Sequence, residues 1–504
     1  MRVLLMHPER DFDAQASFRA NSDALTQDLA LEALITVMAA GDPVLSRVAR
    51  VALLDSLTDL PAIRFRQGVL ADCMQLPEVA RQLYSLASTA VQGEKRIWGF
   101  STKAPALILY RALEVMTHFL QSLRALRDLA DQHADGPSSE GLRRFFDAIR
   151  GELGDDYLLA CAQQLEELRF RRGVLISAGL RSGNKGDGYT LRVQAPERRS
   201  WPARLIPGRG PGMTFEIPER DESGAQALGD LRARGIDSAA RTLAQSAANT
   251  LSFFRQLQAE AGFYVACLNL KGTLEAHDAP LCIPECHTLN DEVLKAEALY
   301  DPCLHLLRKE GAVGNDVDVA GALMVVITGA NQGGKSTFLR SVGLAYLMAQ
   351  AGMFVAARSL SVAIRTQIFT HFRREEDEDM ESGKLDEELA RMSAIADQVT
   401  PGAVLLCNES FASTNEVEGS EIARHVFGAL VGARVQVFLV THLFRLASLY
   451  RSEPSILFLR AERLEDGTLT FRVLPGDPLP TSYGRDLLPL LSGDSDLSRP
   501  DQPR

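Results

Sequence analysis

The chain has 504 residues, of which 46% are hydrophobic and 24% charged, and its formal net charge is −11. These values fit a globular protein of roughly two to four domains and exclude a protein that coats nucleic acid through bulk positive charge. No apolar run reaches the ~18 residues of a membrane span, the apolar start is too short for a secretory signal, and the seven cysteines are scattered. We therefore expect a cytoplasmic protein with free thiols and no membrane partner.

Residues 1–172 are expected to form a helical core domain. Apolar residues recur at alternating spacings of four and three residues, which predicts a helix with one apolar face, at Leu109, Leu113, Met116, Leu120 and Leu123. A loop at 135–141 precedes a second helix with an apolar stripe over 145–168. Packing between long helices explains both stripes without a binding role.

Residues 173–218 differ in composition and predict a small β-rich insertion. Two short apolar runs flank the turn sequence SGNKGDG at 182–188, which indicates a hairpin, and residues 213–217 indicate a further strand. Residues 219–275 return to the helical pattern and are expected to continue the core and form a connecting helix. The tail at 489–504 has the composition of a disordered segment.

The insertion lies in a basic region. Residues 169–209 contain ten basic and two acidic residues, a local net charge of +8 within a chain of −11. Because phosphate contacts supply most non-specific DNA affinity, we predict DNA binding through Arg181, Lys185, Arg192, Arg198, Arg199, Arg204 and Arg209. A solvated loop is the alternative. Tyr189 and Trp201 offer rings for base stacking, with core packing as their alternative use.

Residues 276–488 are expected to form an α/β domain. Short buried-strand patterns at 323–328, 403–408 and 435–441 alternate with helical segments, which predicts a mostly parallel sheet with helices on its faces. The segment DGTLTFRVLPG at 466–476 predicts a late hairpin strand. The fold class expected for the whole chain is a multidomain protein with a long-helix core, a small β-rich insertion and a P-loop α/β domain.

A glycine-rich turn joins the first of these strands to a helix. Its spacing, Gly-x4-Gly-Lys-Ser, is typical of loops whose backbone N–H groups surround phosphate oxygens at a helix N-terminus. Lys335 supplies a cation to the terminal phosphates, and the Ser336 hydroxyl can bind Mg²⁺. We predict a nucleotide site formed by Gly329, Ala330, Asn331, Gln332, Gly333, Gly334, Lys335, Ser336 and Thr337.

Polar residues end the two later strands of this sheet. Glu409 follows the strand at 403–408 and is the candidate that orients or deprotonates the attacking water. Asn408 precedes it where a carboxylate is usual, so Ser336, Asn408 and Glu409 would bind Mg²⁺ weakly. His442 follows the next strand as a candidate γ-phosphate sensor, and a structural strand-end histidine is the alternative.

These motifs together resemble the ATPase domain of the MutS family. The segments ITGANQGGKSTFLRSVGLAYLMAQAGMFVAA, IFTHFRREEDEDMESGKLDEELARMSAI, LLCNESFASTNEVEGSEIA and VTHL are similar to its phosphate loop, signature segment, Walker B strand and switch histidine. The resemblance covers about 290–488 strongly and the helical half loosely. It implies ATP and Mg²⁺ as cofactors, an insertion that grips DNA as a clamp, and a partner chain, identical or paralogous, that closes the nucleotide site.

The sequence also departs from the family pattern. The chain opens in helical core sequence, so we expect no mismatch-recognition domain, and we expect neither a nuclease-like domain nor a dimerisation extension after the ATPase. The family's signature serine, which acts in the partner's site, aligns with Gly383, and Ser382 is adjacent. The acidic run at 375–381 is expected to be an exposed loop beside that segment.

The function expected from these features is a MutS-like ATPase that hydrolyses ATP with Mg²⁺ and gates a dimeric clamp on branched, nicked or unusual DNA. The first alternative is a weakly hydrolysing interaction or regulatory protein that acts with a paralogue, which Asn408 and Gly383 favour. A small-molecule kinase and a partner-protein regulator without DNA are further alternatives. A zinc site at Cys282, Cys286, His287 and Cys303 is a weak possibility, because the spacing matches no common pattern.

Overall fold

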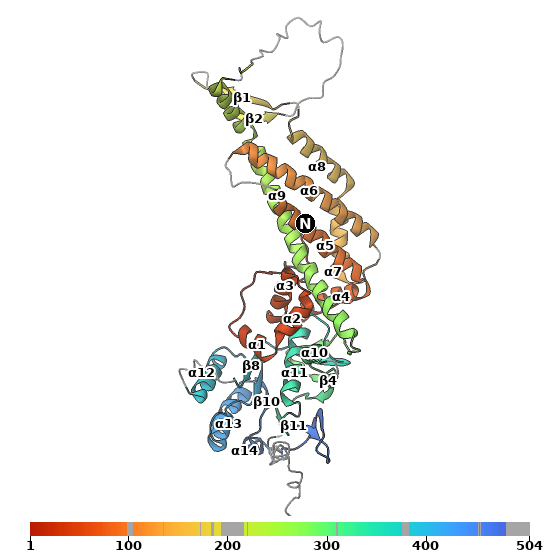
Figure 1. The fold of residues 1–504 in the computed structure, drawn as a ribbon, viewed down its shortest axis with the longest axis vertical. Coiled ribbons are helices and arrows are strands. Elements are labelled where there is room, and N and C mark those ends of the chain that lie inside the picture. The colour runs from red at the N-terminus through yellow and green to blue at the C-terminus, as the bar shows by residue number, and fades with distance from the viewer. Residues whose placement is uncertain are drawn as a thin grey trace, which may run out of the picture. The chain divides into compact units, whose positions relative to one another are not determined.

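The computed structural model of the protein describes residues 1–97, 104–134, 136–171, 173–182, 186–192, 216–218, 220–308, 311–374, 383–451, 453 and 455–479 (Figure 1). Its packing forms two compact units. The helical unit comprises Met1–Val3, Gln82–Gly136 and Arg144–Gln258, and the sheet unit comprises Leu4–Arg81, Pro137–Arg143 and Ala259–Arg504. Among the residues described, no helix is both long and apolar enough to cross a membrane.

The helical unit is built from long helices with apolar faces. It contains α6 (Pro105–Gln132), α8 (Asp155–Leu168) and parts of α5 (Pro77–Arg96), α7 (Glu140–Glu152) and α9 (Glu222–Glu275). The apolar stripe predicted on α6 is buried apart from the half-buried Met116. Phe119 of α6 packs against Phe254 of α9, with ring centroids 5.5 Å apart. The predicted stripes therefore serve the core of this unit.

One helix prediction was wrong. The apolar stripe over 145–168 is divided between α7 and α8 rather than carried by a single helix. Gly154 adopts an extended conformation, with φ −62° and ψ 154°, and forms the N-cap of α8. Residues 222–275, in contrast, form the single helix α9 within the region where the helical pattern was expected to resume.

The hairpin predicted around residues 182–188 is confirmed. Strand β1 (Leu175–Leu180) pairs antiparallel with β2 (Gly186–Arg192), and the register shifts between Ser177 and Gly179. The further strand expected at 213–217 is not seen, because Glu216 and Ile217 lack regular structure and residues 213–215 lie outside the described residues.

The sheet unit contains a six-stranded sheet of order β12-β11-β6-β10-β9-β8. The strands in chain order are β6 (Met324–Thr328), β8 (Ile368–Phe372), β9 (Val404–Asn408), β10 (Gln436–Val440), β11 (Ile456–Arg463) and β12 (Leu469–Pro475). All pair in parallel except β12, the predicted late hairpin strand, which pairs antiparallel with β11. The three strand segments predicted from apolar runs are β6, β9 and β10, at the centre of this sheet.

Helices cover both faces of this sheet. Helix α11 (Lys335–Gln350) is buried over most of its length and packs on β9 and β10. Helices α12 (Lys384–Ala396), α13 (Glu416–Gly432) and α14 (Phe444–Leu449) contribute Met392, Phe427 and Leu446 to an apolar core that the strands complete. The central strands are apolar on both faces because both faces are covered.

A second, four-stranded sheet adjoins this arrangement in the same unit. Its order is β3-β7-β4-β5, formed by β3 (Glu285–His287), β4 (Leu294–Leu299), β5 (Asn315–Asp318) and β7 (Ser359–Ala363). The short helices η2 (Leu289–Asp291) and α10 (Pro302–Leu307) lie in its connections. The β4–α10–β5 segment forms part of the cavity described below.

The N-terminal helices α1 (Ser22–Asp28), α2 (Leu31–Ala39), α3 (Pro43–Leu54) and α4 (Leu60–Gln75) belong to the sheet unit. The Asn21 side chain donates a 2.7 Å hydrogen bond to the carbonyl of Ile368, so this segment covers the edge strand β8. Arg66 of α4 is buried and donates hydrogen bonds to the carbonyls of Met6 and Ala351. Residues 4–81 therefore pack with the sheet, whereas the sequence predicted that they belong to a helical core domain over 1–172. The domain boundaries themselves stay a prediction.

Candidate functional site

The glycine-rich loop, residues 329–334, connects β6 to α11 with an unusual backbone. Gly329 and Gly334 adopt φ values of +119° and +91°, and Gln332 adopts +61°. A Cβ on Gly329 would lie 3.0 Å from the backbone N and O of Ala461 on the neighbouring strand β11. Glycine is therefore required at this position both by conformation and by the close approach of another strand.

Lys335 begins α11 and turns its ammonium back into the glycine-rich loop. Its Nζ donates hydrogen bonds to the carbonyls of Gly329 at 3.0 Å and Ala330 at 2.8 Å. Burial lowers the pKa of this ammonium from its usual range, and the nearby Glu409 carboxylate acts in the opposite direction. A cation is thus held at a helix N-terminus, where both the charge and the backbone N–H groups favour anions.

The ends of β9 and α11 meet through their polar side chains. The hydroxyl of Ser336 donates a 2.9 Å hydrogen bond to Oδ1 of Asn408. The predicted magnesium ligands Ser336 and Asn408 are thus adjacent, and Glu409 borders the same cavity as Ser336. This set of hydroxyl, amide and carboxylate oxygens fits Mg²⁺, and a single carboxylate among them makes it a weak set.

Glu409 is surrounded by positively charged and ionisable side chains. Its Oε1 lies 3.7 Å from Nδ1 of His442, and its Oε2 lies 4.0 Å from Nη1 of Arg373. His442 lowers the pKa of the Glu409 carboxyl the most, Lys335 and Arg373 lower it further through their charge, and burial opposes them. Glu409 also adopts a positive φ of 55°, a left-handed conformation that is uncommon for residues other than glycine.

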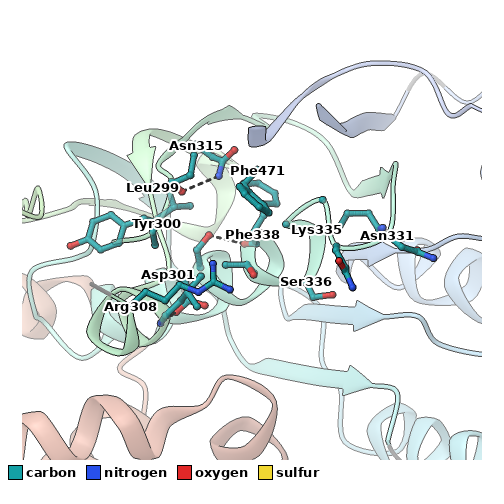
Figure 2. Close-up of a pocket in the computed structure, with 18 of the residues that line it drawn as sticks. Leu299, Tyr300, Asp301, Arg308, Asn315, Asn331, Lys335, Ser336, Phe338 and Phe471 are labelled. Carbon is teal, nitrogen blue, oxygen red and sulfur yellow. Dashed lines mark hydrogen bonds between the residues drawn. The ribbon is translucent and has the colours of Figure 1, made fainter. Parts of the chain in front are cut away.

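A cavity of about 770 Å³ connects these groups to a second wall. Figure 2 shows Asn331, Lys335 and Ser336 on one side and Tyr300, Asp301 and Arg308 on the other. The volume is in the range that small-molecule ligands occupy in proteins. No motif in the sequence marks the second wall, which is formed by residues within 299–308 and 311–315 and by Phe471.

A buried ion pair joins the two walls. Asp301 caps α10 by accepting a hydrogen bond from the backbone N–H of Leu304, and its carboxylate pairs with Arg340 of α11. The Asp301 side chain is fully buried. Breaking a buried pair leaves a charge without a partner, which costs on the order of 3–5 kcal/mol, so this pair fixes the second wall against the helix that follows the glycine-rich loop.

The signature segment is described only from Gly383 onward. Gly383 is the N-cap of α12, in an extended conformation with φ −63° and ψ 148°. Gly383 therefore lies at the start of a helix. Ser382 and the acidic run at 375–381 lie outside the described residues.

The basic region is described only in part. Arg181 and Arg192 lie on the β1–β2 hairpin, where Arg181 pairs with Asp187 at 2.6 Å and Arg192 donates a 2.8 Å hydrogen bond to Ser177. Tyr189 is half-buried with the guanidinium of Arg234 5.8 Å from its ring centroid, an intramolecular use of this ring. Trp201 lies outside the described residues. So do the other predicted DNA contacts, which are Lys185, Arg198, Arg199, Arg204 and Arg209.

The weak zinc hypothesis is contradicted. Among the residues that the structure describes, no three His, Cys, Asp or Glu side chains form a group that could hold a metal ion. Cys282, Cys286 and Cys303 are free thiols, and His287 is engaged instead with the Ser361 hydroxyl at 2.7 Å.

Comparison with known proteins identifies the two halves of the chain. The model of the MutS2 N-terminal domain matches residues 58–277, and that of MutS domain V matches residues 325–486. The DNA mismatch repair protein MutS of Chloroflexus aurantiacus is 32% identical over 189 residues, which are 36% of this chain and 19% of that protein.

Two further relatives also carry MutS names. The DNA mismatch repair protein MutS of Thermus aquaticus is 35% identical over 179 residues, covering 35% of this chain and 22% of that protein. MutS protein homolog 4 of Mus musculus is 28% identical over 218 residues, covering 42% of this chain and 22% of that protein. The chain thus spans about a fifth of the length of these curated relatives.

Fold, site and comparisons together define the class of the protein. It is a multidomain, helix-rich protein with mixed sheets that contains MutS domain V. The chain belongs to the MutS family, as the sequence motifs predict.

Proposed function

We propose that this chain is a MutS-like ATPase whose nucleotide cycle gates a dimeric clamp on branched, nicked or otherwise unusual DNA, in DNA repair or recombination. The observation that carries the proposal is the convergence of the glycine-rich loop, Lys335, Ser336 and Glu409 on one cavity, with Asn408 hydrogen-bonded to Ser336. Membership of the MutS family and the presence of domain V support it.

The proposed reaction is the hydrolysis of ATP to ADP and phosphate. Lys335 and the loop N–H groups bind the phosphates, and Glu409 orients the attacking water and accepts its proton. The bond from the water oxygen to the γ-phosphorus forms while the bond to the β–γ bridging oxygen breaks, and ADP leaves with that electron pair. Mg²⁺, held by Ser336 and Asn408 with Glu409 nearby, would supply charge neutralisation at the phosphates.

The clamp part of the proposal rests on the β1–β2 hairpin and on the charge of the region around it. The net charge of +8 over residues 169–209 supports DNA binding, although Arg169 and Arg171 are already paired with Glu166 at 3.2 and 3.1 Å. The arginines beyond the hairpin are therefore the main candidates for phosphate contacts.

The test is the ATPase rate of the full chain without DNA and with duplex, single-stranded and branched DNA. We expect Mg²⁺-dependent turnover that branched DNA alters more than duplex does. Lys335→Ala should abolish turnover and tight ATP binding, whereas Lys295→Ala, an exposed lysine that pairs with Asp318 at 3.7 Å, should change neither. Unchanged ATP affinity of the Lys335→Ala protein in calorimetry would refute the phosphate-loop assignment.

A second candidate function is favoured by one observation. Asn408 places a neutral amide where the Ser336 hydroxyl meets the end of β9, which supports slow hydrolysis. In this alternative the chain binds ATP, hydrolyses it poorly and regulates a paralogous partner. Single-turnover hydrolysis separates the two candidates, since only the second retains bound ATP over many minutes.

A further inference from the structure

Arg373 is a cation beside the proposed reaction centre that has no assigned role. It follows the last residue of β8, and its backbone N–H donates a 3.0 Å hydrogen bond to the carbonyl of Asn408. Strands β8 and β9 pair in parallel with Phe372 opposite Asn408, so the two strands end side by side. This arrangement fixes the backbone of Arg373 next to the residue that precedes Glu409.

The Arg373 side chain borders the cavity. It lines the same space as Lys335, Ser336 and His442, and its Nη1 lies 4.0 Å from Oε2 of Glu409. The side chain remains 40% exposed. A half-exposed ion pair at this distance contributes little to stability, so pairing with Glu409 does not by itself explain a guanidinium here.

The charges of the site suggest a different use. A nucleoside triphosphate brings several negative charges to the cavity, and Lys335 is buried among the loop carbonyls at one side of it. Asn408 contributes no charge, so the proposed magnesium ligands hold the metal weakly. A guanidinium offers paired N–H donors that match phosphate oxygens and keeps its charge at any physiological pH.

We propose that Arg373 is a catalytic residue that binds the γ-phosphate of ATP within its own chain. This proposal rests on the proposed ATPase function and adds a residue to it. Arg373 moves from Glu409 to the phosphate oxygens, where it offsets the negative charge of the transferred group. It donates hydrogen bonds and transfers no proton, because the proton of the attacking water goes to Glu409.

The neighbouring residue provides a matched control. Arg374 is the same residue type one position later, but its Nη2 lies 3.4 Å from Oδ1 of the buried Asp28 on α1. Its charge is therefore engaged with the N-terminal helices. Arg373→Ala, Arg373→Lys and Arg374→Ala in the full chain separate a phosphate contact from a general loss of positive charge at the end of β8.

The experiment measures binding of a non-hydrolysable ATP analogue and of ADP by calorimetry, together with kcat. For Arg373→Ala we expect about a 10- to 100-fold loss of affinity for the analogue, the usual range for a charged hydrogen bond, with unchanged affinity for ADP. The kcat should fall on the order of a hundredfold. Arg373→Lys should recover part of both losses, and Arg374→Ala should match the wild type in its preference for the analogue over ADP.

The outcomes distinguish this proposal from the one on which it rests. If the wild type binds and hydrolyses ATP and Arg373→Ala keeps the wild-type ratio of analogue to ADP affinity, the role of Arg373 is refuted and the ATPase stands. An equal loss of affinity for both nucleotides, in Arg373→Ala and Arg373→Lys alike, would also refute it, because that pattern indicates a misfolded site. If the wild type binds neither nucleotide, the ATPase function itself fails.

Discussion

The hydroxyl of Ser336, in the first turn of α11, donates a 2.9 Å hydrogen bond to the side-chain carbonyl of Asn408, the last residue of β9. An aspartate at position 408 would accept the same bond and add a negative charge. The proposed magnesium site therefore carries one negative charge fewer than it would with an aspartate at position 408.

Asn408→Asp should tighten Mg²⁺ binding during turnover. A carboxylate oxygen replaces an amide oxygen next to Ser336, and a hard divalent cation favours the charged ligand. We expect the Mg²⁺ concentration for half-maximal ATPase activity to fall about tenfold, which corresponds to about 1.4 kcal/mol. Asn408→Ala serves as the opposite control and should raise it. An unchanged Mg²⁺ dependence in both variants would place position 408 away from the metal.

The parts of this site that follow one another in the sequence were predictable, and the parts that come from other segments of the chain were not. The run from β6 through the glycine-rich loop to α11 is continuous in sequence, so its apolar strand, glycines and Lys335 form a recognisable pattern. The strand ends at Glu409 and His442 follow apolar runs and are brought together because β9 and β10 are neighbours. The ends of buried parallel strands are thus readily found from sequence.

No sequence pattern marks the second wall of the cavity. Asp301 is one of many acidic residues in the chain, and only the tertiary structure shows that it is buried against Arg340. Arg373 lies in a charged stretch that the sequence analysis treated as part of the signature segment. The packing of residues 4–81 onto the sheet was also missed, because an apolar helix face indicates burial without indicating the surface that buries it.

Glu409→Gln should retain ATP binding and lose turnover. The amide keeps the shape of the side chain but cannot accept a proton from water, and its neighbour His442 loses a charged partner at 3.7 Å. We expect kcat to fall by about 10² to 10⁴ while ATP affinity changes little. Rapid-quench and equilibrium binding measurements on the same preparation check both parts. Persistent turnover would remove Glu409 from the role of base.

His371 should make the sheet unit sensitive to acid. Its ring is fully buried on β8, with Nε2 3.0 Å from the Glu388 carbonyl and Nδ1 2.7 Å from the Ser410 hydroxyl. A carbonyl only accepts, so Nε2 of the neutral ring carries the proton. The Ser410 hydroxyl, which lies beside Nδ1, donates a 2.9 Å hydrogen bond to the backbone carbonyl of His371. Burial, with a further contribution from Arg391, lowers the pKa of His371 from 6.5 to about 4.

The direction in which pH changes the stability follows from proton linkage. Because the unfolded state binds the proton more tightly, the stability that the neutral ring confers is complete above pH 6.5 and is lost as the pH falls from 6.5 towards 4. Between pH 7.5 and 5 this amounts to about 2 kcal/mol of unfolding free energy. Urea denaturation at both pH values should show a smaller loss in His371→Gln than in the wild type. An equal loss would mean that His371 does not titrate on unfolding.

Replacing Arg198, Arg199 and Arg204 with Ala should weaken DNA binding and reduce its dependence on salt. Each lost phosphate contact should lower the slope of log affinity against log salt by about 0.9 on duplex DNA. Arg50→Ala is a suitable control, because Arg50 pairs with Glu32 at 2.6 Å within the sheet unit. Fluorescence anisotropy at four salt concentrations gives the slopes. An unaltered slope in the triple variant would place the DNA-binding surface elsewhere.

ATP should promote a dimer through the ATPase domains, and ADP should relax it. We expect a second chain's signature segment to complete the γ-phosphate side of the proposed site, as the resemblance to the MutS family implies. Gly383 is the N-cap of α12 and supplies no hydroxyl, so we expect backbone N–H groups at this helix start to bind the phosphate. Sedimentation velocity of Glu409→Gln protein without nucleotide, with ADP and with ATP and Mg²⁺ measures the effect. We expect a dimer to be most populated with ATP and Mg²⁺, and Lys335→Ala to abolish that difference. A monomer in all three conditions would contradict a homodimer, and the completing segment would then have to come from a paralogous chain.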